Sequence, residues 1–142
     1  MNDAVLLDTC AVIWLASGDP LTPDAMAAIL RAGVGGGIFV SPISAWEIGM
    51  LSKPRAGRLG TLSFLPDPKT WFARFMAGPG IRAAPFNLDI AIDASWLPAE
   101  IHGDPADRLI VATARHLGVP IVTRDSKLAA YAATGEVAVI AC

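Results

Sequence analysis

The sequence predicts an α/β fold built on a parallel sheet. Short apolar runs bounded by turn residues alternate with helical stretches along the 142 residues, which is the pattern of strands covered by helices on both faces. Hydrophobic residues make up 54% of the chain and charged residues 17%, so a substantial core is expected and intrinsic disorder is excluded. The length suits one domain over residues 1–142, because domains typically hold about 100–150 residues.

Five strands are expected in chain order. Each is a short apolar run that ends at turn or polar residues, as buried parallel strands do. The runs cover residues 4–7, 38–40, 81–86, 120–123 and 137–140.

Helix starts are well marked between these runs. An N-cap residue is followed by proline at Thr22-Pro23, Ser41-Pro42 and Asp104-Pro105, and this pairing is typical of a first helical turn. We expect Gly33 to end the first of these helices and Gly118 the last, with the middle one over 42–52. Further helices are expected at 68–77, 88–96 and 126–133. Glycines 35–37 read as a connection between helix and strand, and 59–68 as an irregular segment.

Three features restrict the compartment. The longest apolar run, residues 10–16, is far shorter than the roughly 18 residues of a membrane span. The first residues lack the basic stretch of a secretory signal. Cys10 and Cys142 form no framework of cysteine pairs, so we expect reduced thiols. These features predict a cytoplasmic protein without a membrane segment.

Charge is unevenly distributed although the formal net charge is only -2. Residues 53–82 hold six basic residues against one acidic residue, a local net charge of +5, which leaves -7 on the rest. An acidic body with one basic stretch can place carboxylates at a site and cations beside it to hold a polyanion. A solvated loop and helix face is the alternative interpretation.

Two acidic residues follow expected strands. Asp8 comes directly after the first strand, and Asp125 follows the fourth with Arg124 between. In open parallel sheets ligands bind at the carboxyl ends of strands, near the point where the strand order reverses. If these two strands are neighbours, both carboxylates lie at the same edge.

A third acid, Asp107, lies in the first turn of the helix that begins at Asp104-Pro105. That helix start faces the same sheet edge in a right-handed β-α-β arrangement. Both Asp104 and Asp107 also favour the positive end of the helix dipole. Asp107 is therefore either a cap or a site residue, with Asp104 as its competitor.

Glu47 lies in the expected helix 42–52 on one stripe with Ile43, Met50 and Leu51. A carboxylate at this spacing is expected to face the interior, where an unpaired charge is costly and a cation is needed. That cation is either a metal ion or an arginine, for which Arg108 and Arg124 are candidates.

Four converging carboxylates would repel one another, and a divalent cation removes that repulsion. Oxygen ligands select a hard ion, Mg²⁺ or Mn²⁺, over zinc or copper. His102 and His116 lack the spacing of zinc ligands.

These acids stand in blocks whose order resembles the PIN-domain nucleases. The chain looks most like the VapC-type toxins of bacterial toxin–antitoxin pairs, and the likeness covers essentially the whole sequence. The blocks are Leu6-Leu7-Asp8-Thr9, Ser44-Ala45-Trp46-Glu47-Ile48, His102-Gly103-Asp104-Pro105-Ala106-Asp107-Arg108-Leu109-Ile110-Val111-Ala112-Thr113-Ala114 and Val122-Thr123-Arg124-Asp125.

The resemblance implies a PIN-like three-layer α/β/α sandwich with a central, mostly parallel sheet of about five strands. It implies a quartet that is both catalytic and metal-binding, with Thr9 and Arg108 as supporting residues and a variable excursion over 53–80. The fourth acid is the one that the family tolerates losing. The quartet is Asp8, Glu47, Asp107 and Asp125. The candidate RNA-binding residues beside the site are Lys53, Arg55, Arg58 and Arg124.

The function implied is hydrolysis of RNA phosphodiester bonds by an endoribonuclease that depends on Mg²⁺ or Mn²⁺. An RNA substrate, a cognate antitoxin and a homodimer are the partners implied. Surface contacts are a possible use of Trp14, Trp46, Trp71 and Trp96, for which core packing is the default expectation.

Three other interpretations remain open at this point. A phosphatase or phosphotransferase would use Asp8 as nucleophile, although Cys10 stands where one such family has a second Asp. A non-catalytic module for binding RNA or protein would keep the scaffold, but an intact quartet argues against it. Metal-free RNA cleavage would require His102 and His116 to converge.

Overall fold

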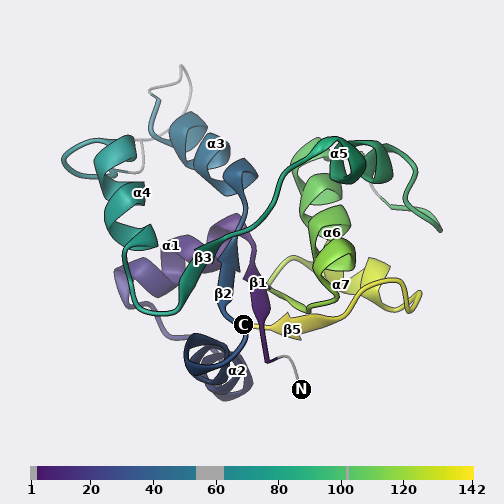
Figure 1. The fold of residues 1–142 in the computed structure, drawn as a ribbon, viewed down its shortest axis with the longest axis horizontal. Helices are drawn as coiled ribbons and strands as arrows, with labels where there is room; N and C mark the ends of the chain where they lie inside the picture. Colours follow the sequence, from purple (N-terminus) through teal and green to yellow (C-terminus); the bar gives the residue numbers. More distant parts are fainter. Residues whose placement is uncertain (1–2, 54–62, 102) are drawn as a thin grey trace.

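The computed structural model describes residues 3–53, 63–101 and 103–142, and these form a parallel sheet with helices on both faces (Figure 1). All four strand pairings are parallel, and the strand order is β3-β2-β1-β4-β5. The strands are β1 (Val5–Leu7), β2 (Ile38–Val40), β3 (Ile81–Ala83), β4 (Ile121–Thr123) and β5 (Val139–Ala141). The helices are α1 (Thr9–Ser17), α2 (Pro23–Val34), α3 (Pro42–Leu51), α4 (Pro68–Met76), α5 (Leu88–Ser95), α6 (Pro105–Leu117) and α7 (Ser126–Ala132). The predicted α/β/α sandwich is confirmed.

The marked helix starts are confirmed by their caps. Thr22, Ser41 and Asp104 each accept a backbone N–H of the first turn of α2, α3 and α6, and proline occupies the start of each helix. Gly118 ends α6 in the left-handed conformation, with φ of 68°. Proline suits the start because its missing N–H would be unpaired there in any case.

Three predicted boundaries are wrong, and one helix was not predicted. The fifth strand, expected over 137–140, runs over Val139–Ala141. Gly33 lies inside α2, which continues to Val34 and ends at Gly35. The third strand ends at Ala83 and not at residue 86, and the side chain of Phe86 is exposed. Helix α1 follows β1 directly and was not expected; its residues are apolar on every side, so the sequence carries no amphipathic stripe to indicate a helix.

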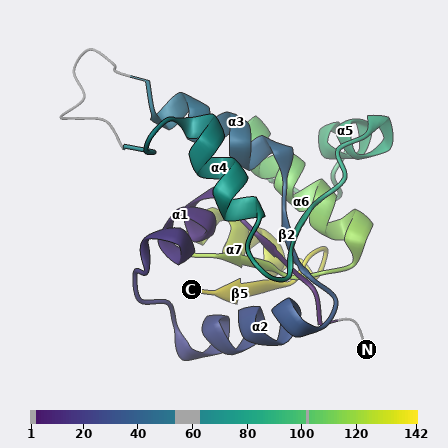
Figure 2. The ribbon, with the colours of Figure 1, turned by 60° about the vertical axis from the view of Figure 1, so that its left-hand side comes forward.

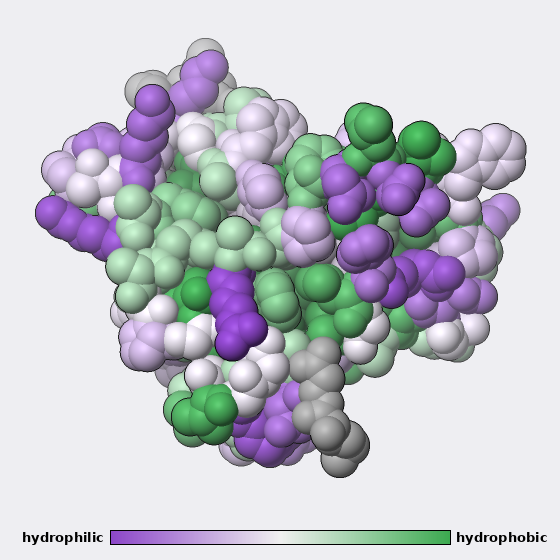
Figure 3. Space-filling view, in the orientation of Figure 1, coloured by the Kyte–Doolittle hydropathy of each residue, from purple (hydrophilic) through white to green (hydrophobic). Residues whose placement is uncertain are grey.

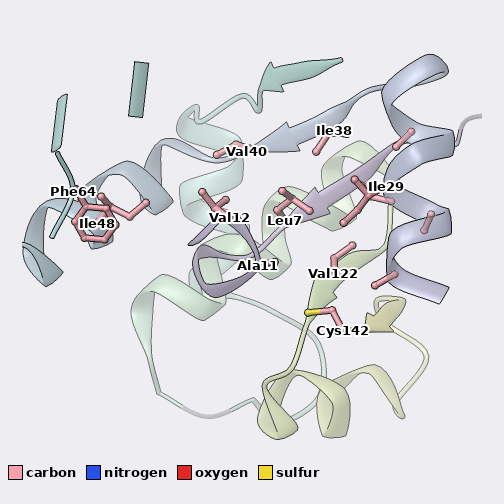
Figure 4. Close-up of a cluster of buried hydrophobic side chains, with 14 residues drawn as sticks. Leu7, Ala11, Val12, Ile29, Ile38, Val40, Ile48, Phe64, Val122 and Cys142 are labelled. Atoms are coloured by element: carbon pink, nitrogen blue, oxygen red, sulfur yellow. The ribbon is translucent and has the colours of Figure 1, made fainter. Parts of the chain in front are cut away.

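The sheet separates two apolar layers because successive side chains of a strand point to opposite faces. Val5 and Leu7 of β1 pack against α1 and α2 on one face (Figure 4). Leu6 packs with α6 and α7 on the other, where Ile110 and Leu128 are buried. Every residue of β1 is therefore buried, as a central strand of a three-layer fold requires.

The strand order reverses between β1 and β4. From β1 the chain moves outward through β2 to β3, then returns to the other side of β1 to form β4 and β5. The carboxyl ends of β1 and β4 lie side by side, with Leu7 opposite Val122 and the Asp8 N–H donating to the Val122 carbonyl at 3.2 Å. This is the topological position at which open α/β sheets bind ligands.

Helix α5 lies at the edge of the fold, reached from β3 by an extended segment, and packs on α6 (Figure 2).

The expectation of core packing is wrong for two of the four tryptophans, since Trp46 is 60% exposed and Trp96 83% exposed. Trp14 and Trp71 are partly buried against the core. In the described part of the chain, no helix is both long and apolar enough to cross a bilayer.

Candidate active site

Asp8 is the most deeply placed acid of the predicted quartet. It follows β1, caps the start of α1, and has a side chain only 8% exposed. One carboxylate oxygen, Oδ1, accepts the Ala11 N–H at 2.8 Å, and the other, Oδ2, accepts the Thr123 hydroxyl. Burial raises the pKa of Asp8, with the charges of Asp107 and Asp125 adding to the rise and the two hydrogen bonds opposing it.

Glu47 reaches the same edge from α3. Its side chain is half-buried and accepts a hydrogen bond from the Thr9 hydroxyl, and Thr9 Oγ1 lies 3.0 Å from Ser44 Oγ, one turn earlier in α3. Burial raises the pKa of Glu47, and the charges of Asp107, Asp104 and Asp8 raise it further. The predicted supporting position of Thr9 thus corresponds to a direct bond between Thr9 and one of the acids.

The two acids at the start of α6 occupy different positions. Asp104 is the N-cap, and its Oδ1 accepts the backbone N–H of Ala106 at 2.9 Å and of Asp107 at 3.3 Å. Asp107 stands at the third residue of the helix and is partly exposed. Its charge raises the pKa of both Asp8 and Glu47, which places it within electrostatic reach of these two acids.

Asp125 caps α7 at the carboxyl end of β4. Its Oδ1 accepts the Lys127 N–H at 2.8 Å, and its own N–H donates to Thr123 Oγ1 at 3.0 Å. Its charge acts on Asp8. The fourth acid therefore lies beside the first, as expected if β1 and β4 are neighbours.

The Cys10 thiol lies within electrostatic reach of all four acids. Part of its side chain reaches solvent, yet its pKa is raised to about 11. Burial contributes most to that rise, followed by the negative charges of Asp8, Glu47, Asp107 and Asp125. A single thiol thus experiences the field of the whole predicted quartet.

Neither candidate arginine neutralises Glu47. Arg108 donates from Nε to the Ala94 carbonyl at 3.0 Å and from a terminal nitrogen to Ser95 at 3.2 Å, which ties α6 to the end of α5. Arg124 donates to the carbonyls of Cys142 and Pro20 at 2.7 and 2.8 Å, and its guanidinium carbon lies 3.8 Å from the centre of the Trp14 ring. Both side chains serve packing between elements, and the alternative of an arginine ion pair with Glu47 is not found among the described residues.

The donor chemistry of the site suits a hard divalent cation. Carboxylate and hydroxyl oxygens lie at the sheet edge, where Asp8 is buried and Glu47 half-buried. Oxygen donors of this kind favour Mg²⁺ or Mn²⁺ over softer metals. Across residues 3–53, 63–101 and 103–142, no three Asp, Glu, His or Cys side chains already form a group that could hold an ion. The acids are thus neighbours within electrostatic reach and do not form a closed cage.

The remaining predicted residues lie away from this edge or outside the described residues. Lys53 is exposed beyond the end of α3, while Arg55, Arg58 and His102 belong to positions that the structure does not describe. His116 stands in the last turn of α6, at the opposite end of the helix from Asp107. The nine-residue step from Asp107 to His116 spans about 13 Å of helix at 1.5 Å per residue.

Two buried hydroxyl residues at the site were not singled out from the sequence. Thr123 links β4 to Asp8, and Ser44 lies beside Thr9. Ser44 carried a weak signal, because it precedes Glu47 by three residues and so shares its helix face. Thr123 carried none, because its contact with Asp8 depends on pairing of strands that are 115 residues apart.

The sequence of this chain is similar to one protein family and to one characterised relative. The PIN domain family matches residues 5–134. Ribonuclease VapC22 of Mycobacterium tuberculosis is 32% identical over 130 residues, which cover 89% of this chain and 91% of the relative.

Two solved structures are similar in fold. One is the complex VapBC2 from Rickettsia felis bound to a promoter DNA fragment, with a TM-score of 0.65, 16% identity and coverage of 97% of this chain and 98% of the matched chain. The other is DNA-bound VapBC from Salmonella typhimurium, with a TM-score of 0.63, 16% identity and coverage of 99% and 98%.

Proposed function

The chain belongs to the PIN domain family, and from this premise we propose that it is a metal-dependent endoribonuclease acting as the toxin of a toxin–antitoxin pair. The observation that supports the proposal is that the charges of four carboxylates all act on the region around Cys10, at the point where the strand order reverses. Of these acids, Asp8 is buried and Glu47 half-buried, and each accepts a hydrogen bond from a threonine hydroxyl. The relative is named a ribonuclease, and this activity is extended here to the present chain.

Asp8, Glu47 and Asp107 would be the principal metal ligands, with Asp125 binding the ion directly or through water. A bound divalent ion supplies the Lewis acidity that hydrolysis of a phosphodiester requires. The chain supplies fixed positions, because Asp8 is held through both oxygens and Glu47 through Thr9. The acids also exclude a nearby phosphate until their charge is neutralised, so metal and RNA are expected to bind together.

Basic residues outside the acid cluster would hold the RNA backbone. Lys53 is exposed beyond α3, and Lys69, Arg74 and Arg82 are exposed on α4 and β3. Arg55 and Arg58 are proposed on sequence grounds alone. Arg124 and Arg108 are weaker candidates for direct contact with phosphate or for orienting carboxylates, since their guanidinium groups already bind backbone carbonyls.

Cleavage of total cellular RNA by the purified, antitoxin-free protein tests this function. We expect cleavage with Mg²⁺ or Mn²⁺, none with EDTA, and loss of cleavage in Asp107→Asn. Asp104→Asn is the matched control three residues away, because Asn caps a helix as well as Asp does, and it should retain most of the activity. Cleavage that survives EDTA, or no cleavage of any RNA by folded protein supplied with metal, would overturn the proposal.

An antitoxin is the proposed protein partner, and the cytoplasm, where such a pair would meet cellular RNA, is the proposed compartment. Binding by the antitoxin is expected to suppress the cleavage described above. Co-purification of the two proteins with loss of nuclease activity would support this part, whereas full activity in the presence of a bound partner would contradict it.

A second copy of the chain is proposed to cover the α3–α5 apolar surface, defined by five exposed side chains. Trp46 and Phe86 line one cavity between α3 and α6, and the other three are spaced four residues apart on one side of α5. Figure 3 shows apolar groups standing at the surface over α5 beside hydrophilic ones. Several exposed large apolar side chains on neighbouring elements make this surface a candidate interface. The five residues are Trp46, Phe86, Leu88, Ile92 and Trp96.

The oligomeric state checks this surface. We expect the wild-type chain to run as a dimer in size-exclusion chromatography with light scattering, and Ile92→Asp and Trp96→Asp to run as monomers with unchanged far-UV circular dichroism. Val34→Asp is the matched control, because Val34 is 93% exposed on α2 and lies outside the surface. A monomeric wild type at micromolar concentration would exclude the proposed dimer.

A further inference from the structure

Thr123 is a buried polar residue whose two side-chain hydrogen bonds both lead to the acid cluster. It is the last residue of β4, and its side chain is 1% exposed. Its hydroxyl donates to Asp8 Oδ2 and accepts the backbone N–H of Asp125 at 3.0 Å. A buried hydroxyl is tolerated when it is hydrogen-bonded, and any backbone carbonyl nearby could satisfy it. Here both hydrogen-bond partners of the hydroxyl belong to acids of the site.

The direction of these bonds is fixed by their chemistry. A threonine hydroxyl has one hydrogen to donate. Since the Asp125 N–H is itself a donor, it occupies a lone pair of Thr123 Oγ1 and leaves the hydroxyl hydrogen for the carboxylate of Asp8. The hydroxyl therefore faces Asp8 only as a donor.

The consequence is that the Asp8 carboxylate cannot turn freely. Its Oδ1 is held by the Ala11 N–H and its Oδ2 by Thr123, so rotation of the carboxylate plane breaks at least one bond. The same hydroxyl holds the backbone at Asp125, where α7 begins. One side chain thus fixes the first acid relative to the fourth across two strands.

We propose that Thr123 is a positioning residue of the nuclease site, which sets the orientation of Asp8 and the place of Asp125 for binding of one shared cation. The inference rests on the proposed function and adds a residue to it. A merely structural hydroxyl would stabilise β4 and leave both metal affinity and turnover of the folded protein unchanged.

Two substitutions separate these cases. Thr123→Val keeps the shape and removes the hydroxyl, whereas Thr123→Ser keeps the hydroxyl. We expect the Val variant to lose about 10–100-fold in kcat, the range for partners that orient metal ligands, with KM for RNA little changed. Its affinity for Mn²⁺, measured by calorimetry without substrate, should fall, and the Ser variant should restore both values to within a few-fold of wild type.

Thr113→Val is the matched control. Thr113 is equally buried, in α6, and its hydroxyl donates to the Leu109 carbonyl at 2.7 Å, away from the acids. This variant should keep wild-type kcat and Mn²⁺ affinity even if its melting temperature falls.

The outcomes distinguish this inference from the proposed function. A wild-type protein that neither cleaves RNA nor binds Mn²⁺ overturns both. If the wild type cleaves RNA and binds Mn²⁺, and Thr123→Val equals it in kcat and Mn²⁺ affinity, only the positioning role is overturned. If the Val variant does not fold, the Ser variant provides the test. A folded Thr123→Ser variant that loses kcat and Mn²⁺ affinity, while Thr113→Val keeps both, would contradict the proposal, because the Ser variant retains the hydroxyl.

Discussion

Replacing Asp8 by Asn is expected to abolish RNA cleavage without unfolding the protein. Asp8 is central to the site: it follows β1, its charge interacts with Asp107 and Asp125, and both of its oxygens are held. Asparagine keeps the size of the side chain and can still accept the Ala11 N–H as an N-cap, but it removes the negative charge that a cation requires. Because outer-shell partners of metal ligands are worth about 10–100-fold, loss of a ligand should reduce kcat by more than about 100-fold.

The stability of this variant adds a second criterion. Burial and neighbouring acids raise the pKa of Asp8, so the ionised carboxylate is unfavourable in the metal-free fold at neutral pH. The melting temperature of Asp8→Asn in EDTA should therefore be equal to or above that of wild type. A variant that loses activity through misfolding would show the opposite.

Cleavage assays and thermal melts on the same preparations check both expectations. Asp24→Asn is a suitable control, because Asp24 is an exposed acid in the first turn of α2 and should retain wild-type activity. Retained cleavage by Asp8→Asn would contradict the assignment of Asp8 as a metal ligand.

Much of the fold was predictable because short local sequence patterns determine where its helices and strands begin and end. The Ser41-Pro42 and Asp104-Pro105 pairs specify helix starts through backbone chemistry that acts over three residues. Short apolar runs such as Ile38–Val40 identify central strands because both of their faces are buried. Helix α1 escaped prediction because its apolar residues are not confined to one side of the helix and so carry no amphipathic periodicity.

The site was predictable in its acids and not in its hydroxyl groups. Asp8 directly follows β1 and Asp125 stands two residues beyond the end of β4, at the edge where open parallel sheets bind ligands. The roles of Arg108 and Arg124 were not predictable, because the carbonyls that they bind belong to the end of α5, to Pro20 and to Cys142, which only the folded chain brings near. Thr123 likewise depends on which strand becomes the neighbour of β1, and this is a property of the assembled sheet.

The effect of divalent metal on stability is expected to depend strongly on pH. In the metal-free protein, burial raises the pKa of Asp8 and of Glu47. A group whose pKa is higher in the folded than in the unfolded chain contributes stability that is fully present below the unfolded pKa and is lost as the pH rises through the folded pKa. These two carboxylates therefore favour the metal-free fold in mild acid and disfavour it at neutral pH.

Metal binding acts in the opposite direction, because only ionised carboxylates bind the cation and protons compete with it. At neutral pH, Mg²⁺ or Mn²⁺ at 100 times its Kd should add about 2.7 kcal/mol to the free energy of unfolding. That increment should shrink as the pH falls through the raised pKa values of Asp8 and Glu47 and become small near pH 4, close to the usual carboxyl range.

Denaturant titrations with metal and with EDTA, between mild acid and neutral pH, measure this increment directly. The wild type should show it only toward neutral pH, and Asp8→Asn should show little at any pH because a ligand is missing. An increment that is independent of pH, or that persists in Asp8→Asn, would place the metal elsewhere on the protein. Because this readout needs no RNA, it tests the carboxylate site even if the natural substrate is a single RNA sequence absent from the assay.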